Sequence, residues 1–505
     1  MSDEQVRPRR IKKRWIVLGV LGAVIVVAGG LTVRAVLSEP DVSRDVGQEL
    51  ITFSADAQKG FPEPDFDAYA LWLSTASRVN ELSRAAALAA DDEANRGKPD
   101  TQDRWQFELA YLGTPAEDPI LRKHAGKLLA DLDAQGVTRD WARVASAGRI
   151  IMKKQDGPLL GWLLPELGGT RAMARAEAAR MRLAAASGDW DGMLAPFERM
   201  LSIARLCQYQ PILITSLVGL AIEELARNEL IAIMIERPLP EPVLVRATEI
   251  IDRHAARPPA DFPFKGERIG IQDTINRTHS SSGLMLPARV AELGLSGSGP
   301  TGVGAPKNVS PLLNVLGYLA PSKNETEQKF DELFGRVFLD AMRTPRERIT
   351  KPSDADVWVE KTPANYLLVK LLMPALTTAQ RSFDRRQLSE SGIRTMIAIE
   401  RHRARSGGAP PENLARIDAD LKTLLRDDPW TEEPFGYRVL SGDPAGRTYL
   451  LYAYGLDGKD DQGVVDDKVP EVALSRPSEA QGKDYVINRP RGLPAAPRDA
   501  RSPAP

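Results

Sequence analysis

Five aspartates near the C-terminus form the part of the sequence best suited to chemistry. They fall within 11 residues, around Gly458 and Gly463, and are Asp457, Asp460, Asp461, Asp466 and Asp467. Calcium takes about six to eight oxygen ligands, and glycines let a chain fold tightly around an ion. We therefore predict a calcium (Ca²⁺) site at these five residues. The alternative is a solvated acidic turn, because aspartate and glycine also favour turns for conformational reasons.

Motifs for other chemistry are missing from the sequence. It contains no G-x-S-x-G, H-E-x-x-H or G-x-x-x-x-G-K-[ST] motif, and the G-x-G-x-x-G at residues 297–302 lacks the strand and helix that such a loop needs. The lone Cys207 lies in an apolar stretch, where a buried, inert thiol is expected. Glu223 and Glu224 are adjacent and point to different helix faces, so they make a poor catalytic pair. We predict a protein that is not an enzyme; a carboxylate-dependent hydrolase is the second alternative, because two acids across a cleft suffice for that chemistry.

Charge and composition restrict the class of partner. The 505 residues include 67 lysines and arginines against 68 aspartates and glutamates, so the formal net charge is −1. Nucleic-acid binding leaves a strongly basic footprint that is absent from this balance, and we predict no nucleic-acid partner. The apolar share of 43% is that of a globular protein.

The N-terminus predicts a membrane anchor. Residues 15–33 are uncharged and mostly apolar, close to the roughly 20 residues that cross a bilayer as a helix. Six basic residues precede this run, which places residues 1–14 in the cytoplasm, the membrane helix at 15–37 and the bulk of the chain on the other side. We expect a single-pass signal-anchor protein of the inner (cytoplasmic) membrane, with the membrane itself as one partner. A cleaved signal peptide, cut near the small residues 28–30, is the alternative.

The elements that would carry the acidic stretch are mainly helical. Apolar residues at three- and four-residue spacing predict a helical domain at 38–255 and a helical segment at 312–406, joined by a flexible Pro/Gly/Ser-rich loop at 256–311. Residues 180–206 resemble one tetratricopeptide-type hairpin, with an Ala-rich helix followed by a turn and a second helix. The exported body is therefore expected to be a helical bundle or a repeat-like array.

Residues 407–475 predict a small α+β module with a β-hairpin. Alternating apolar residues end at Val439, a turn follows, and TYLLYAYG supplies the second strand. We expect a disordered tail at 476–505, apart from a short extended piece at 485–487.

This module resembles the globular domain of type II secretion pseudopilins over about residues 390–467. The residues that carry the resemblance are Asp428-Pro429-Trp430, Pro434, Tyr437, Tyr452, Tyr454-Gly455 and Asp457-Gly458. The resemblance implies a long helix packed on a hairpin, a bacterial source, and calcium bound by the loop after the last strand. A pseudopilin also has a processing site and a glutamate early in its apolar helix, and this sequence has neither.

Together these features predict a mainly α protein with a membrane helix and a pilin-like C-terminal module. The function expected is that of a non-enzymatic, extracytoplasmic (periplasmic) helical scaffold that binds a protein partner. The first alternative is a structural component of a type II secretion or pilus-like apparatus with a calcium-stabilised loop.

Overall fold

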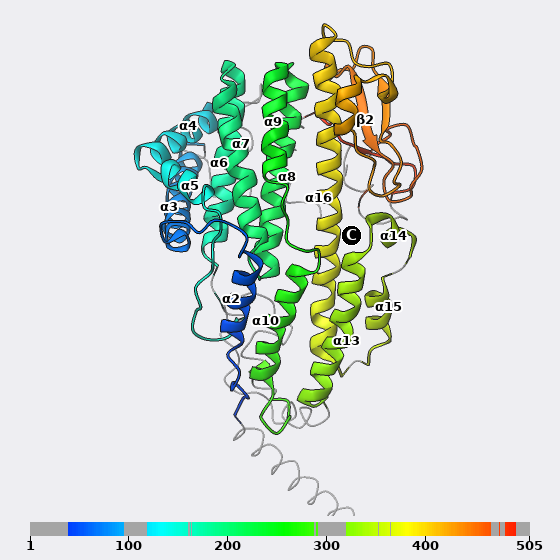
Figure 1. Cartoon of the computed structure of the whole chain (residues 1–505). Coiled ribbons are helices and arrows are strands. Elements are labelled where there is room, and N and C mark those ends of the chain that lie inside the picture. Colours follow the sequence, from blue (N-terminus) through cyan, green and yellow to red (C-terminus); the bar gives the residue numbers. More distant parts are fainter. Residues whose placement is uncertain are drawn as a thin grey trace, which may run out of the picture.

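The computed structural model is built mainly from helices, with one small antiparallel sheet (Figure 1). It describes residues 39–94, 119–159, 162, 164–286, 289–290, 320–351, 353–363, 365–465, 474 and 480–490. The predicted basic tail at 1–14 lies outside these residues, as does the membrane helix at 15–37. Within the described ranges, every helix is too short or too polar to cross a bilayer. The expected mainly helical chain is confirmed.

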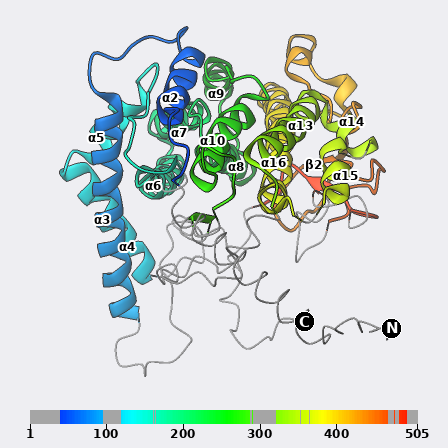
Figure 2. The same ribbon diagram turned by 90° about the horizontal axis from the view of Figure 1, so that it is seen from below.

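The N-terminal half forms a row of packed helices. Its members are α3 (Ala68–Ala94), α4 (Pro119–Ala134), α5 (Val137–Ala145), α6 (Glu166–Ser187), α7 (Trp190–Gln208), α8 (Leu213–Glu236) and α9 (Glu241–Arg253). Helix α2 (Val46–Ala57) precedes them and packs on α10 (Phe262–Thr278). Helix α6 packs against α3 and α7, and α7 packs along α8. Seen from below, the row continues from α3 at one side to the long helix α16 (Leu367–Arg405) near the other (Figure 2). Buried large side chains such as Trp72, Trp141 and Phe197 fill the spaces between these helices.

The hairpin predicted at 180–206 corresponds to the end of α6 and most of α7. Gly188 ends α6 with a φ of 74°, a left-handed conformation that glycine adopts without strain. Asp189 then caps α7, because its side chain accepts a hydrogen bond of 2.8 Å from the backbone N–H of Gly192. The apolar face of α7, with Phe197 and Leu201, is buried as its spacing predicts.

Close approach of α6 to α3 depends on Gly169, which gives the first testable prediction. A Cβ atom at this position would overlap the backbone carbonyl of Ala76 in α3, so Gly169→Ala forces the two helices apart. We expect this substitution to lower the free energy of unfolding by about 1–3 kcal/mol in chemical denaturation. Gly335→Ala is the control: Gly335 faces open space within a helix, and alanine there should add about 0.5–1 kcal/mol. Equal effects of the two variants would contradict the packing role of Gly169.

A second group of helices packs beside the first row at the other end of the molecule. It comprises α10 (Phe262–Thr278), α13 (Lys323–Met342), α14 (Pro345–Thr350) and α15 (Asp354–Lys361). Helix α13 begins with a capping box in which Ser322 and Glu325 exchange side-chain-to-backbone hydrogen bonds. Phe264 of α10, Phe330 and Phe334 belong to the separate hydrophobic cluster of this group.

The flexible loop predicted at 256–311 is wrong over residues 262–278. Prolines flank this stretch, but Pro263 lies in the first turn of α10, where a missing N–H costs no hydrogen bond. Ile271 and Ile275 then bury one face of the helix. The Pro/Gly/Ser-rich composition therefore favoured a loop, although the apolar residues of this stretch follow helical spacing. Residues 291–311 of the predicted loop lie outside the described part of the chain.

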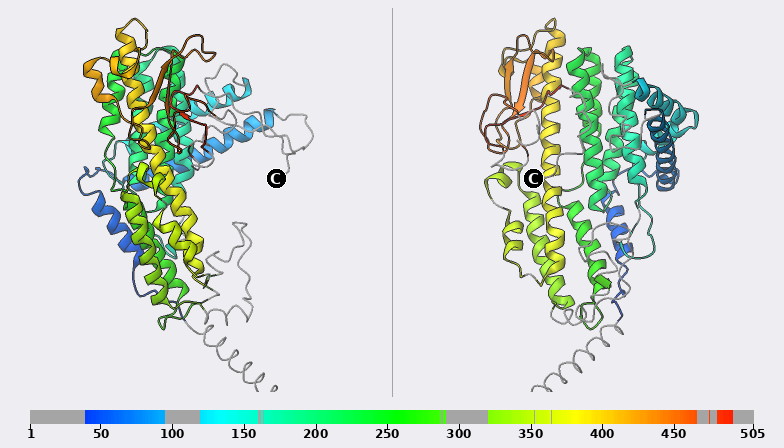
Figure 3. Two further views of the ribbon diagram at one scale, coloured as in Figure 1. Left: turned by 90° about the vertical axis from the view of Figure 1, so that its right-hand side faces the viewer. Right: turned by 180° about the vertical axis from the view of Figure 1, so that it is seen from behind.

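The long helix α16 (Leu367–Arg405) runs past both groups and carries the sheet against its C-terminal half (Figure 3). The sheet has the order β1-β2-β3, with β1 (Gly436–Val439), β2 (Tyr449–Ala453) and β3 (Tyr485–Val486) antiparallel. Short 3₁₀ helices at Leu414–Arg416 and Ala419–Leu424 connect α16 to the sheet. Tyr449 donates a hydrogen bond of 2.8 Å from its hydroxyl to Glu400 of α16.

The boundary predicted between the module (407–475) and the disordered tail (476–505) is wrong, because β3 completes the sheet. The extended piece expected at 485–487 is confirmed, and it pairs with β2 rather than standing alone. Asn488 then donates to the carbonyl of Tyr449 at 2.6 Å and accepts from the N–H of Leu451 at 2.9 Å. These bonds make residues 484–488 part of the module.

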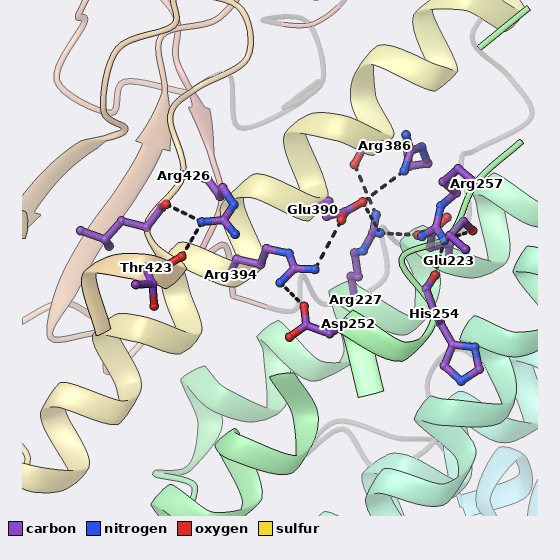
Figure 4. A network of polar contacts seen from close by, with 12 residues as sticks. Glu223, Arg227, Asp252, His254, Arg257, Arg386, Glu390, Arg394, Thr423 and Arg426 are labelled. Atoms are coloured by element: carbon purple, nitrogen blue, oxygen red, sulfur yellow. Dashed lines mark hydrogen bonds and ion pairs between the residues drawn. The ribbon is translucent and has the colours of Figure 1, made fainter. Parts of the chain in front are cut away.

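Arginines and carboxylates form a buried ion-pair network between α8 and α16 (Figure 4). Glu223, fully buried on α8, accepts hydrogen bonds from Arg227 and Arg257, and from Gln208 at 2.8 Å. Arg227 also reaches Glu390 of α16 at 3.3 Å. Burial opposes ionisation of Glu223, but the charges of Arg227, Arg257 and Arg386 outweigh it and lower its pKa. The network fixes how α16, and hence the module, sits on the helical row.

Candidate functional site

The acidic loop follows β2 directly and is shaped by residues with positive φ. Gly458 and Gly463 have φ angles of 66° and 77°, and Gln462 has 58°. The positive φ of Gly463 favours glycine at this position, and a Cβ atom there would also displace the end of the Leu450 side chain. The sequence therefore folds the acidic stretch tightly around its two glycines, as predicted.

The structure describes three of the five predicted ligands. Asp457 accepts a hydrogen bond of 3.2 Å from the backbone N–H of Lys459 through one oxygen, and its other oxygen is buried without a hydrogen-bond partner. Asp460 is exposed and accepts from the N–H of Gln462 at 2.8 Å and from the hydroxyl of Tyr452 at 2.9 Å. Asp461 also has one buried carboxylate oxygen without a partner. The predicted ligands Asp466 and Asp467 lie outside the described residues.

Sequence reasoning missed a further carboxylate, Asp484. It precedes β3 and is fully buried against the loop, where its Oδ2 accepts a hydrogen bond of 2.7 Å from the N–H of Gly463. Its Oδ1 has no hydrogen-bond partner. Asp484 is 21 residues beyond Gly463, in a stretch assigned to a disordered tail. The alternation of Tyr485, Val486 and Ile487 was the one available signal that this stretch is ordered.

The loop concentrates negative charge, which the neighbouring Lys459 offsets only in part at Asp461. Burial, together with the charges of Asp461 and Asp460, raises the pKa of Asp484 to about 7. Burial and the charge of Asp457 raise the pKa of Asp461 as well. The ion pairs formed among the described residues include none to Asp457, Asp460, Asp461 or Asp484. Carboxylates held close together without a cation destabilise the loop.

This donor set fits calcium in its chemistry. Every unpartnered buried atom of the loop, on Asp457, Asp461 and Asp484, is a carboxylate oxygen, and Ca²⁺ prefers such hard ligands. In the described residues, however, no three carboxylates, imidazoles or thiols already stand close enough together to hold a metal ion. Binding would therefore require side-chain rotation around the loop.

Asp428, the first residue of the Asp428-Pro429-Trp430 element, stabilises the turn beside this loop. It is fully buried, and its two oxygens accept hydrogen bonds from the N–H groups of Trp430 at 2.9 Å and Tyr454 at 3.0 Å. Burial raises the pKa of Asp428 to about 6. The aspartate of this element thus ties the turn before β1 to the end of β2.

The raised pKa of Asp428 predicts a pH dependence of stability. A carboxyl group with a folded-state pKa above its ordinary value of 3.8 stabilises the fold most below pH 4, and this contribution is lost as the pH rises through 6. In EDTA, we expect the stability advantage of the wild type over Asp428→Asn to fall by roughly 2–3 kcal/mol between pH 4 and pH 7. Chemical unfolding at both pH values measures it. A constant advantage would show that Asp428 does not ionise in this range.

Two carboxylates share a separate cavity of about 400 Å³ between the α8–α9 turn and α16. Hydrogen bonds from Arg405 and Arg401 lower the pKa of Glu241, whereas burial raises the pKa of Glu400. Arg403 holds both oxygens of Glu400, at 2.7 and 2.9 Å. Arginines therefore already engage both acids of this pair.

A third feature is a cavity of about 190 Å³ where the module meets α13, α14 and α16. Trp430 and Leu456 form the side contributed by the module, and Leu456 immediately precedes Asp457. Arg348 and Asp384 form an ion pair in its wall and neutralise each other, with one N–O distance of 3.0 Å. Asp340, Asp356 and Arg381 also line the cavity, so its wall combines apolar and charged side chains.

Comparison with known proteins adds no relative: no protein-family model, curated protein or solved structure matches the chain. Cys207, the remaining nucleophile considered from the sequence, is fully buried, and burial raises the pKa of its thiol far above the ordinary value. The acidic loop with Asp484 is therefore the best-supported candidate site.

Proposed function

We propose that this protein is a membrane-anchored, extracytoplasmic helical scaffold whose pilin-like C-terminal module is stabilised by calcium. The observation that carries the calcium part is the set of unpartnered buried carboxylate oxygens on Asp457, Asp461 and Asp484. The membrane anchor and the orientation rest on the sequence of residues 1–37 and on the positive-inside rule.

The arrangement of the module supports its relationship to pseudopilins. A long helix, α16, packs on a three-stranded antiparallel sheet, and the acidic loop follows β2. The matched residues also do structural work: Asp428 holds the turn, and Tyr437 donates a hydrogen bond of 2.7 Å to the carbonyl of Pro411. The residues that carry the resemblance thus hold the module together.

The helical body favours a scaffold over a subunit of a pilus-like apparatus. The main hydrophobic cluster runs from the N-terminal helices through α16 into the module, and a second cluster lies around α10 and α13. The module is therefore one side of a much larger body. A scaffold of this kind binds a protein partner, and the cavity beside Leu456 suits an apolar side chain of that partner. A structural role in a type II secretion apparatus remains the first alternative; stable co-purification with inner-membrane secretion components would favour it.

Thermal unfolding of the full-length chain in detergent, with calcium and with EDTA, tests the calcium site. A ligand at 100 times its Kd adds about 2.7 kcal/mol to the folded state, so the unfolding transition that includes the sheet should move to a higher temperature. The double variant Asp457→Ala, Asp461→Ala should lose this shift. Glu433→Ala, which removes an exposed negative charge from the same module, should keep it. An unchanged transition of the wild type would identify the acidic stretch as a solvated turn.

The opposed pKa shifts of Glu241 and Glu400 support a second candidate function, a carboxylate-dependent hydrolase. It ranks below the scaffold because Arg403 and Arg405 already hold both acids. Hydrolysis of a panel of glycosides and esters by the wild type, abolished in Glu400→Gln, would reverse this order.

A further inference from the structure

We propose that a cavity between α2, α8 and α10 binds an apolar molecule that carries a single amino group, with Glu267 as the counter-ion of the amine. The cavity has a volume of about 350 Å³, which lies within the range of small-molecule sites. It shares no residue with the acidic loop, so this inference does not depend on the proposed function.

The walls of the cavity are mainly apolar and carry one charge. Leu50 of α2, Leu213 and Leu217 at the start of α8, and Ile271 of α10 contribute to them. Helix α10 packs against both α2 and α8 in this part of the molecule (Figure 1). Glu267 is the one ionisable residue among the described residues that line the cavity. The cavity therefore fits an apolar body and receives a charged group at a single point.

Glu267 lines the cavity without a basic partner. The ion pairs formed among the described residues include none to Glu267. The two cations next to it on α10, Lys265 and Arg268, pair with other aspartates, at 2.7 and 2.6 Å. Burial raises the pKa of Glu267, whereas a hydrogen bond from the backbone N–H of Leu213 lowers it. A protonated amine beside Glu267 would form a charge-assisted hydrogen bond, whereas a carboxylate ligand would be repelled.

Gly270 leaves space beside Glu267. It follows Glu267 by three residues and precedes Thr274 by four, so the three residues share one face of α10. A Cβ atom at Gly270 would meet no atom within 4 Å, so no neighbouring element requires a glycine there. A glycine inside a helix destabilises that helix relative to alanine. Gly270 therefore contributes to the cavity an opening that packing does not explain.

The cavity opens to solvent beside Ile214. This residue lines the cavity and is 48% exposed, although its side chain is large and apolar. Leu50 and Leu213, by contrast, are buried in the wall. An apolar ligand that enters here would cover Ile214 and fill the space behind it, which gains contacts that an unfilled cavity lacks.

Isothermal calorimetry of the full-length chain in a nonionic detergent, with hexylamine and hexanoate as probes, tests the proposal. The two probes share an apolar chain and carry opposite charges at neutral pH. We expect the wild type to bind hexylamine at least about tenfold more tightly than hexanoate. Glu267→Gln should reduce this ratio to below about threefold, because a neutral amide does not prefer a cation.

A second pair of variants tests whether the cavity itself is the site. Gly270→Leu should weaken hexylamine binding at least about tenfold, because the leucine side chain occupies the space beside Glu267. Gly335→Leu is the matched control: Gly335 also faces open space within a helix, and it does not line the cavity. This control should bind hexylamine as the wild type does.

Three results would each overturn the inference: no binding of hexylamine by the wild type, equal affinity of the wild type for the two probes, and unchanged binding by Gly270→Leu. Should Gly270→Leu fail to fold, the ratio of the two affinities in the wild type and in Glu267→Gln decides. None of these results bears on the calcium test of the proposed function, because the cavity and the acidic loop lie on different elements.

Discussion

Replacing Glu223 with alanine is expected to lower the free energy of unfolding by about 3–5 kcal/mol, the largest loss that we foresee for a single side chain. Glu223 is fully buried and accepts hydrogen bonds from two arginines of the network, Arg227 and Arg257. Its removal leaves Arg257 without its carboxylate partner and leaves Arg227 only the longer contact with Glu390. Urea unfolding followed by circular dichroism measures the loss.

Glu224→Ala is a matched control for this variant. Glu224 is the next residue on α8, its side chain is 36% exposed, and its ion pair with Arg385 has an N–O distance of 3.4 Å. An exposed pair of this kind contributes at most about 1 kcal/mol. Similar losses for the two variants would mean that the buried network contributes no more than a surface ion pair.

Glu166→Leu should have the opposite effect and raise the free energy of unfolding by roughly 2–4 kcal/mol at neutral pH. Glu166 begins α6 and is 1% exposed, yet neither of its carboxylate oxygens has a hydrogen-bond partner. Leucine removes the unpaired polar group and keeps the interior filled. Chemical unfolding of the variant and the wild type in the same buffer tests this gain.

Burial raises the pKa of Glu166, so the gain should depend on pH. Below the ordinary pKa of a glutamate, Glu166 is neutral and its burial costs the folded state least. The folded state loses stability as the pH rises through the folded-state pKa of Glu166. The advantage of leucine should therefore be larger at pH 8 than at pH 4. Glu177→Leu on the same helix is the control; it should destabilise, because Glu177 is paired with Arg199 at 2.6 Å. A loss of stability in Glu166→Leu would point to an unseen partner for this carboxylate.

Local patterns predicted most of the helical architecture. The repeat of small and apolar residues through α6 and α7 identified a hairpin, and Phe197 and Leu201 are buried as expected. Helix α10 was missed because proline and glycine frequency outweighed the spacing of Ile271 and Ile275. Periodicity over 17 residues was a better guide than composition over a longer window.

The candidate site was predictable only in part, because it joins segments far apart in sequence. Spacing identified Asp457, Asp460 and Asp461, which lie on one loop. Asp484 reaches that loop through pairing of β3 with β2, and no local pattern encodes such a contact. The buried ion pairs of Glu223 could not be predicted for the same reason, because its partner Arg257 comes from the segment between α9 and α10.

The continuity of α16 has a mechanical consequence. The helix runs for 39 residues, about 58 Å at 1.5 Å per residue, and contributes side chains to both large hydrophobic clusters. Val369 and Leu376 are embedded at one end, and Ile393 and Ile397 at the other. Such a rod behaves as a lever: a load applied to the sheet is carried towards the α10–α13 end as a tilt of the helix, and Pro374, which lacks a backbone N–H, is where the helix would bend.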